Sequence, residues 1–256
     1  MIITDFLDFI RFRISAAASL VSAAGYLFFS PVGYELAFVV LAAFFICTFG
    51  YSYNGLKDKK EDSINKGKSN ILSKGKVGYI IPVFCLLTGM SASVLLAPSA
   101  FFSYALFAVL LFIYSFFRIK RYLIIKNLYT AFGLGLVFLA GAAAGTSVAN
   151  SFIPYLIVSF FFLIGSIISD LRDYHGDRSC NIRTIPVVFG REDAKNILYF
   201  LLLSFFITVL ASGIYKLFIL LPFVAAELYL IRVDKPGHAH LFGMLAVLLM
   251  PLYLLL

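Results

Sequence analysis

The sequence predicts an all-α integral membrane protein, and three observations carry this prediction. The 256-residue chain is 62% hydrophobic and only 13% charged, whereas soluble domains are closer to half apolar and a quarter charged. The apolar residues form long runs, without the alternation of polar and apolar residues that is typical of membrane β-barrels. Lysine and arginine gather in a few segments between these runs. A chain of this kind is expected to cross a bilayer repeatedly as helices.

Nine apolar runs are long enough to be transmembrane helices. We expect them to form a single polytopic domain over residues 1–256. The small residues of the segment Ala140–Gly145 favour close helix packing in such a bundle. In chain order, the expected spans are residues 13–31, 34–53, 77–97, 99–117, 122–146, 151–169, 194–213, 214–232 and 238–256.

The hydrophilic segments between the spans differ greatly in length. Only Pro98 and its neighbours divide the third span from the fourth, and the seventh and eighth spans meet near Gly213. By contrast, residues 54–76 and 170–193 are long and highly charged. These two segments are where we expect the chemistry of the protein.

The distribution of basic residues predicts the orientation. Under a nine-span topology, every lysine and arginine except Lys216 falls on one side of the membrane. Because cytoplasmic segments are enriched in these residues, we expect the N-terminus and both charged segments in the cytoplasm, with the chain in the cell membrane. The net charge of +8 then reflects topology and contact with anionic headgroups. It gives no reason to expect nucleic-acid binding.

Two acidic clusters occupy the charged segments, and each follows an even-numbered span. Asp58 and Asp62 lie in the first cluster. In the second, Asp170 is followed by Asp173 and Asp177, which repeat the spacing of the first pair. This register suggests a weak internal duplication of two four-helix halves followed by a ninth helix. The two halves are about residues 13–117 and 122–232.

Aspartates four residues apart lie on one face of a helix, so each pair can direct two carboxylates at one cation. Mg²⁺ prefers oxygen ligands and shares carboxylates with substrate phosphates, while nearby lysine and arginine bind the remaining phosphate charge. A single pair is more often a solvated, salt-bridged surface, but two pairs in matching register favour a site for a Mg²⁺-bound diphosphate. A transporter or channel that binds a divalent cation is the alternative. Against it, the charges lie on one face rather than at mid-bilayer.

Both clusters resemble motifs of one family, the UbiA superfamily of intramembrane prenyltransferases. Residues 54–65 resemble its first motif, usually N-D-x-x-D-x-x-x-D-x-I-N. Residues 170–190 are similar to its second motif, which continues through G-D-R/K and T-x-P-V to a glycine. The resemblance extends over about residues 8–195. Between the two motifs, the similar positions are Tyr114-Ser115, Ile119-Lys120-Arg121 and Asn127.

The resemblance implies a bundle of nine helices around a central cavity, with the two aspartate-rich loops at its cytoplasmic end. It also implies which residues form the site. Those expected to bind the diphosphate through Mg²⁺ are Asn54, Asp58, Asp62, Asp170, Asp173 and Asp177. The resemblance also suggests that Lys120 and Arg178 contact phosphate oxygens. The full set of candidate diphosphate-binding residues adds Asn54, Lys68, Arg118 and Arg172. The candidate catalytic residues are Asp58, Asp62, Asp173 and Asp177, with Tyr114 as an aromatic face for the allylic cation.

The sequence departs from the family pattern at three places. Gly55 stands where the first motif usually has a second aspartate, and Ser69 begins a pair that is commonly Arg-Pro, so Lys68 is the candidate to replace the lost charge. The step from Tyr114 to Lys120 is one residue longer than usual, which makes Arg118 a rival phosphate contact. These departures leave open a family member that binds without catalysing.

The implied reaction is Mg²⁺-dependent transfer of a polyprenyl group from a polyprenyl diphosphate to a lipophilic acceptor, within membrane lipid. The segment Gly176–Val187 is closer to the lipid, chlorophyll and carotenoid branches of the family than to the haem branch. A glycerol-phosphate lipid is therefore the favoured acceptor, and a quinone-type aromatic the next.

Overall fold

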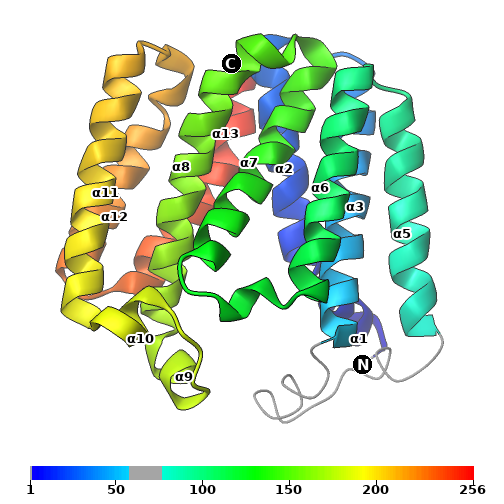
Figure 1. The fold of residues 1–256 in the computed structure, drawn as a ribbon. Coiled ribbons are helices and arrows are strands. Elements are labelled where there is room, and N and C mark those ends of the chain that lie inside the picture. The colour runs from blue at the N-terminus through cyan, green and yellow to red at the C-terminus, as the bar shows by residue number, and fades with distance from the viewer. Residues whose placement is uncertain (1, 58–76) are drawn as a thin grey trace. The chain divides into compact units, whose positions relative to one another are not determined.

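A computed structural model describes residues 2–57 and 77–256, and every regular element in those residues is a helix (Figure 1). The all-α prediction is confirmed for this part of the chain. The described residues divide into two compact units. The N-terminal unit draws on Met1–Arg118 and Leu136–Val148, and the C-terminal unit on Ile119–Gly135 and Ala149–Leu256.

Helix α3 is the centre of the N-terminal unit, where it packs against α2, α5 and α6 (Figure 1). Helix α6 begins at Pro98. Proline is well tolerated there because the N–H groups of the first turn of a helix have no acceptor within the helix. The helices of this unit are α1 (Ile2–Phe9), α2 (Phe12–Phe29), α3 (Glu35–Lys57), α5 (Val77–Val94), α6 (Pro98–Phe116) and the second half of α7 (Ile125–Gly145).

Close contacts between backbones hold α2 against the second half of α7. A Cβ added at Gly25 would lie 2.0 Å from the carbonyl oxygen of Phe138, and one added at Gly141 would lie 1.9 Å from that of Ser22. Nearby, the fully buried Tyr104 hydroxyl lies 2.6 Å from the Ser22 hydroxyl. The prediction of close packing at Ala140–Gly145 is confirmed.

Helix α12 packs against both α11 and α13 in the C-terminal unit. Phe205 of α11 contacts the rings of Phe160 and Phe161 on α8. The helices of this unit are the first half of α7, α8 (Val148–Arg172), α9 (Tyr174–Ser179), α10 (Ile185–Phe189), α11 (Arg191–Ser212), α12 (Leu220–Arg232) and α13 (Pro236–Leu255), with 3₁₀ turns η2 (Ile119–Arg121) and η3 (Tyr215–Leu217).

Seven of the described helices are long and apolar enough to cross a bilayer, namely α2, α3, α6, α7, α8, α11 and α13. A shorter apolar helix, Gly78–Val94, lies within α5. The remaining predicted span, 214–232, forms η3 and then α12, which has 13 residues. At 1.5 Å per residue α12 is about 20 Å long, against about 30 Å for the hydrocarbon core, because the turn takes the first residues of that run. The chain is a multi-pass membrane protein.

An ion-pair network joins the start of α11 to the turn between α12 and α13. Asp234 in that turn accepts hydrogen bonds from Arg191 Nη2 at 2.7 Å and Lys195 Nζ at 3.0 Å. The hydrogen bond from Lys195 lowers the pKa of Asp234 below its ordinary value of 3.8. The ionised carboxylate therefore stabilises the fold above pH 3.8, and this contribution is lost as the pH falls through the lowered pKa.

Replacing Asp234 by asparagine is expected to lower the melting temperature at neutral pH by about 1–3 °C, because half-exposed ion pairs contribute little each. Thermal unfolding in detergent at a series of pH values measures the difference. The melting temperatures of the wild type and variant should converge once the pH is below the lowered pKa of Asp234. A difference that persists there would show that packing, not charge, is responsible.

Candidate active site

The second aspartate cluster lies at the end of α8, where the chain continues into α9 with only Asp173 between the two helices. The Asp173 N–H donates to the Ser169 carbonyl at 3.0 Å, and the Asp177 N–H donates to the Asp173 carbonyl at 3.0 Å. Helical hydrogen bonding therefore continues across the cluster. The two aspartates therefore keep the i, i+4 backbone spacing of a helix, but Asp173 is a turn residue between α8 and α9, so they do not lie on one continuous helix that runs out of the span.

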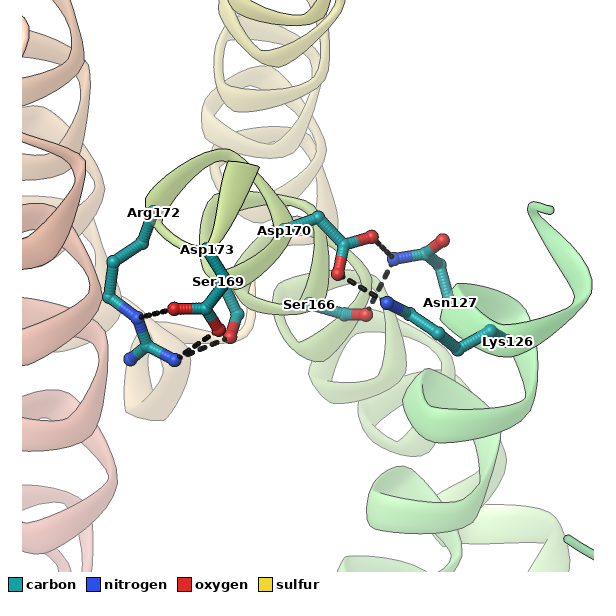
Figure 2. A network of polar contacts seen from close by, with 7 residues as sticks. All are labelled: Lys126, Asn127, Ser166, Ser169, Asp170, Arg172 and Asp173. Atoms are coloured by element: carbon teal, nitrogen blue, oxygen red, sulfur yellow. Dashed lines mark hydrogen bonds and ion pairs between the residues drawn. The ribbon is translucent and has the colours of Figure 1, made fainter. Parts of the chain in front are cut away.

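Asp170 is buried, with 5% of its surface exposed. Its Oδ1 accepts from Lys126 Nζ at 2.5 Å, and its Oδ2 accepts from Asn127 Nδ2 at 2.9 Å (Figure 2). The Asn127 amide also donates to Ser166 Oγ at 2.8 Å. Both donors come from the first turn of α7, so this network ties the start of α7 to the end of α8.

Asp173 is half exposed and is held by its chain neighbour. Arg172 donates from Nε to Oδ1 at 2.8 Å and from Nη2 to Oδ2 at 2.7 Å, and its Nη2 also reaches Ser169 Oγ (Figure 2). These charge-assisted bonds lower the pKa of Asp173. The carboxylate is therefore ionised at neutral pH.

Asp177 lies four residues after Asp173 and is partly buried, and this burial raises the pKa of its carboxyl group.

Tyr174, in the same short helix as Asp177, contacts two guanidinium groups. Arg178 Nη1 donates to the Tyr174 hydroxyl at 2.9 Å, and the guanidinium carbons of Arg178 and Arg191 each lie 6.0 Å from the centre of its ring. Two guanidinium groups therefore lie against the side chain of Tyr174, the residue that follows Asp173.

The other predicted site residues are distributed over both units. Asn54 lies in the last turn of α3, and Tyr114 lies in the last turn of α6, close before Arg118. Lys120 lies in η2, in the C-terminal unit. Asp58, Asp62 and Lys68 lie outside the described residues.

Sequence reasoning missed the site role of Lys126, and it noted Asn127 only as a position of resemblance. A weak signal was present, since Lys126 begins a span on the side of the membrane where the second cluster was expected. The contact itself could not be predicted, because Lys126 and Asp170 are far apart in the sequence.

The described acidic residues could supply part of the ligand set of a metal ion, with the remaining ligands coming from elsewhere. Among the described residues, no group of three or more His, Cys, Asp or Glu side chains is placed to hold a metal ion. Asp173 and Asp177 offer two carboxylates. Two are enough for a cation such as Mg²⁺, which takes its remaining ligands from water and substrate phosphate.

These features define a polytopic α-helical membrane protein with a site of carboxylate and guanidinium groups at the end of a long span. Residues 14–254 match the sequence profile of the UbiA prenyltransferase family. The chain therefore belongs to this family and is a membrane prenyltransferase. The resemblance noted in its two aspartate motifs is confirmed.

Similar proteins support this placement. The digeranylgeranylglyceryl phosphate synthase of Methanopyrus kandleri is 30% identical over 170 residues, which cover 65% of this chain and 61% of the relative. The enzyme of the same name from Methanococcus aeolicus is 29% identical, over 80% of this chain and 75% of the relative.

Solved structures show the same fold. A UbiA homolog from Archaeoglobus fulgidus bound to GPP and Mg²⁺ superposes with a TM-score of 0.79 at 16% identity, covering 98% of this chain and 99% of that one. A structure of digeranylgeranylglyceryl phosphate synthase superposes with a TM-score of 0.76 at 21% identity, covering 99% and 97%.

Proposed function

We propose that this prenyltransferase uses Mg²⁺ to transfer a geranylgeranyl-type chain from its diphosphate to a glycerol-phosphate lipid in the membrane. The observation that carries the proposal is the position of Asp173 and Asp177, one helical turn apart at the end of an apolar span, with Arg172 bonded to Asp173 and Arg178 bonded to the intervening Tyr174. This arrangement presents hard anionic ligands and phosphate-binding donors together, beside the hydrocarbon in which a prenyl chain dissolves.

Asp173 and Asp177 would hold the metal together with the first cluster, Asn54, Asp58 and Asp62. When bound, Mg²⁺ supplies electrostatic stabilisation to the diphosphate as it leaves. Asp170 is predicted to be a further ligand, but it differs from Asp173 in being buried, with its two oxygens bonded to Lys126 and Asn127 from another helix.

The guanidinium groups of Arg172 and Arg178 and the ammonium of Lys120, with Arg118 and Lys68, would bind the diphosphate oxygens. As the allylic C–O bond breaks, both electrons leave with the diphosphate, and these fixed donors offset the charge that develops. The acceptor hydroxyl then forms a C–O bond to the allylic carbon and releases its proton. Apolar helix surfaces and the ring of Tyr114 would shield the cation from water.

The proposed acceptor rests on the curated relatives, which are named for the synthesis of digeranylgeranylglyceryl phosphate and are 30% and 29% identical to this chain. That product carries two geranylgeranyl groups on a glycerol phosphate, so the corresponding acceptor carries one. A quinone precursor is the second candidate. Its support is the wider range of acceptors implied by the family resemblance.

The proposal includes a topology. The N-terminus and both aspartate clusters would face the cytoplasm of the cell membrane, and α12 would complete a nine-helix bundle around a central cavity. The chain would be a single catalytic domain, with a repeat of two four-helix halves.

Purified protein in detergent tests the proposal when it is given geranylgeranyl diphosphate and geranylgeranylglyceryl phosphate. The expected result is Mg²⁺-dependent release of diphosphate and a digeranylgeranyl product identified by mass spectrometry. EDTA should abolish the reaction, and excess Mg²⁺ should restore it. Product formation only with 4-hydroxybenzoate would move the acceptor to the quinone class. Divalent-cation flux in proteoliposomes, without prenyl transfer to either acceptor, would support the transporter alternative instead.

A further inference from the structure

Asp170 differs from the other two aspartates of its cluster in both burial and partners. Its side chain is 6% exposed, whereas that of Asp173 is 50% exposed. The donors to Asp170, Lys126 and Asn127, come from a different helix, and both are themselves largely buried. A buried carboxylate is stable only when it is paired and hydrogen-bonded, and here the protein supplies both requirements.

The backbone before Lys126 is shaped to make this contact. Ile124 has a φ of 62°, a conformation that β-branched residues rarely adopt. The turn at Ile124 leads directly into the first turn of α7, which carries Lys126 and Asn127. Such strain persists only where surrounding contacts impose it. The hydrogen bonds from Lys126 and Asn127 to Asp170 are among the contacts that follow this turn.

Lys126 also affects the remainder of the cluster. Its charge lowers the pKa of both Asp173 and Asp177, although in Asp177 burial outweighs this effect. One ammonium group therefore bonds to the first aspartate and acts through space on the other two. It is a permanent positive charge within an acidic cluster.

Building on the proposed function, we propose that Lys126 is a positioning residue that acts as a built-in countercharge. It pairs with the buried Asp170 in place of a metal ion. The metal-binding carboxylates of this cluster are then Asp177 and Asp173, which is half exposed and, among the described residues, pairs only with the exposed Arg172. Asp170 then orients the helix and does not bind metal. The ammonium also adds positive charge next to the position of the diphosphate.

This role predicts opposite changes in the binding of two ligands. Lys126→Met makes the cluster more negative, so a divalent cation should bind the protein more tightly, while inorganic pyrophosphate should bind more weakly. At an effective dielectric constant near 20, removing the charge of Lys126 is expected to change each affinity on the order of tenfold. A residue with only a structural role would not move the two affinities in opposite directions.

The experiment measures Mn²⁺ binding to the donor-free protein by electron paramagnetic resonance, and pyrophosphate binding at saturating Mn²⁺ by calorimetry. Lys126→Arg keeps the charge and should behave as the wild type. Lys126→Met should show the two opposite changes. Reduced thermal stability with both affinities unchanged would overturn the proposal.

The double variant Lys126→Met/Asp170→Asn tests whether Asp170 is a ligand. It removes a neutral pair, so the net charge of the cluster is preserved and Mn²⁺ affinity should return to the wild-type value. It also leaves no buried charge unpaired, so it remains usable if Lys126→Met fails to fold. Mn²⁺ binding weaker than that of the wild type in the double variant would identify Asp170 as a metal ligand and overturn the proposal.

These outcomes are separate from the fate of the proposed reaction. If the wild type binds Mn²⁺ through Asp173 but forms no prenylated product, the proposed function fails while the role of Lys126 is still supported. If product forms but the double variant binds Mn²⁺ more weakly than the wild type, the proposed function is supported while the role of Lys126 fails.

Discussion

Replacing Asp173 by asparagine is expected to slow Mg²⁺-dependent prenyl transfer by about 100-fold or more. The change keeps the size of the side chain and removes the negative charge from the more exposed of the two carboxylates proposed to hold the metal. Loss of one group that stabilises developing charge typically lowers a rate by about 10²–10³-fold. Release of diphosphate from geranylgeranyl diphosphate, measured over a range of Mg²⁺ concentrations, is the appropriate assay.

Asp193→Asn provides the matched control. Asp193 is an exposed carboxylate in the first turn of α11, so its replacement makes the same chemical change outside the cluster. Its rate should stay close to that of the wild type. Near wild-type turnover by Asp173→Asn would remove Asp173 from the metal site. Full rescue by high Mg²⁺ would assign the defect to metal affinity alone.

The second large effect concerns stability and arises at Gly141. Gly141→Ala is expected to lower the melting temperature by about 5–10 °C, because its Cβ would lie 1.9 Å from the backbone carbonyl oxygen of Ser22. A carbonyl in a helix cannot move aside as a flexible side chain can, so the two helices must separate. Overpacking typically costs about 1–3 kcal/mol, and about 2–4 °C accompanies each kcal/mol at this chain length. Thermal unfolding in detergent measures the change.

Gly133→Ala, on the same helix, is the control for this prediction. A Cβ at Gly133 meets nothing within 4 Å, and alanine favours the helical backbone by about 1 kcal/mol over glycine. The control should therefore be as stable as the wild type or slightly more so. Equal destabilisation of the two variants would show that glycine itself matters, and not the close approach of α2 and α7.

Local patterns in the sequence predicted most of the fold and part of the site. Helices in a bilayer must satisfy their own backbone hydrogen bonds, so the long apolar runs predicted most of the helices directly. The exception is the run 214–232, where composition did not reveal the turn at η3 that shortens α12 to 13 residues. Spacing predicted the i, i+4 relation of Asp173 and Asp177, because helical periodicity is a local property, but it did not predict the break at Asp173 between α8 and α9.

What the sequence alone determined is the class and family of the protein, since both depend on patterns of residues close together in the chain. The tertiary structure decided which aspartate is buried together with its partners. Asp170 and Asp173 belong to the same acidic motif of the sequence. In the fold, however, Asp170 is buried against Lys126 and Asn127, which lie in the first turn of α7. No local pattern contains that contact, because a carboxylate's partners depend on which helices pack together, and its availability for metal depends on those partners.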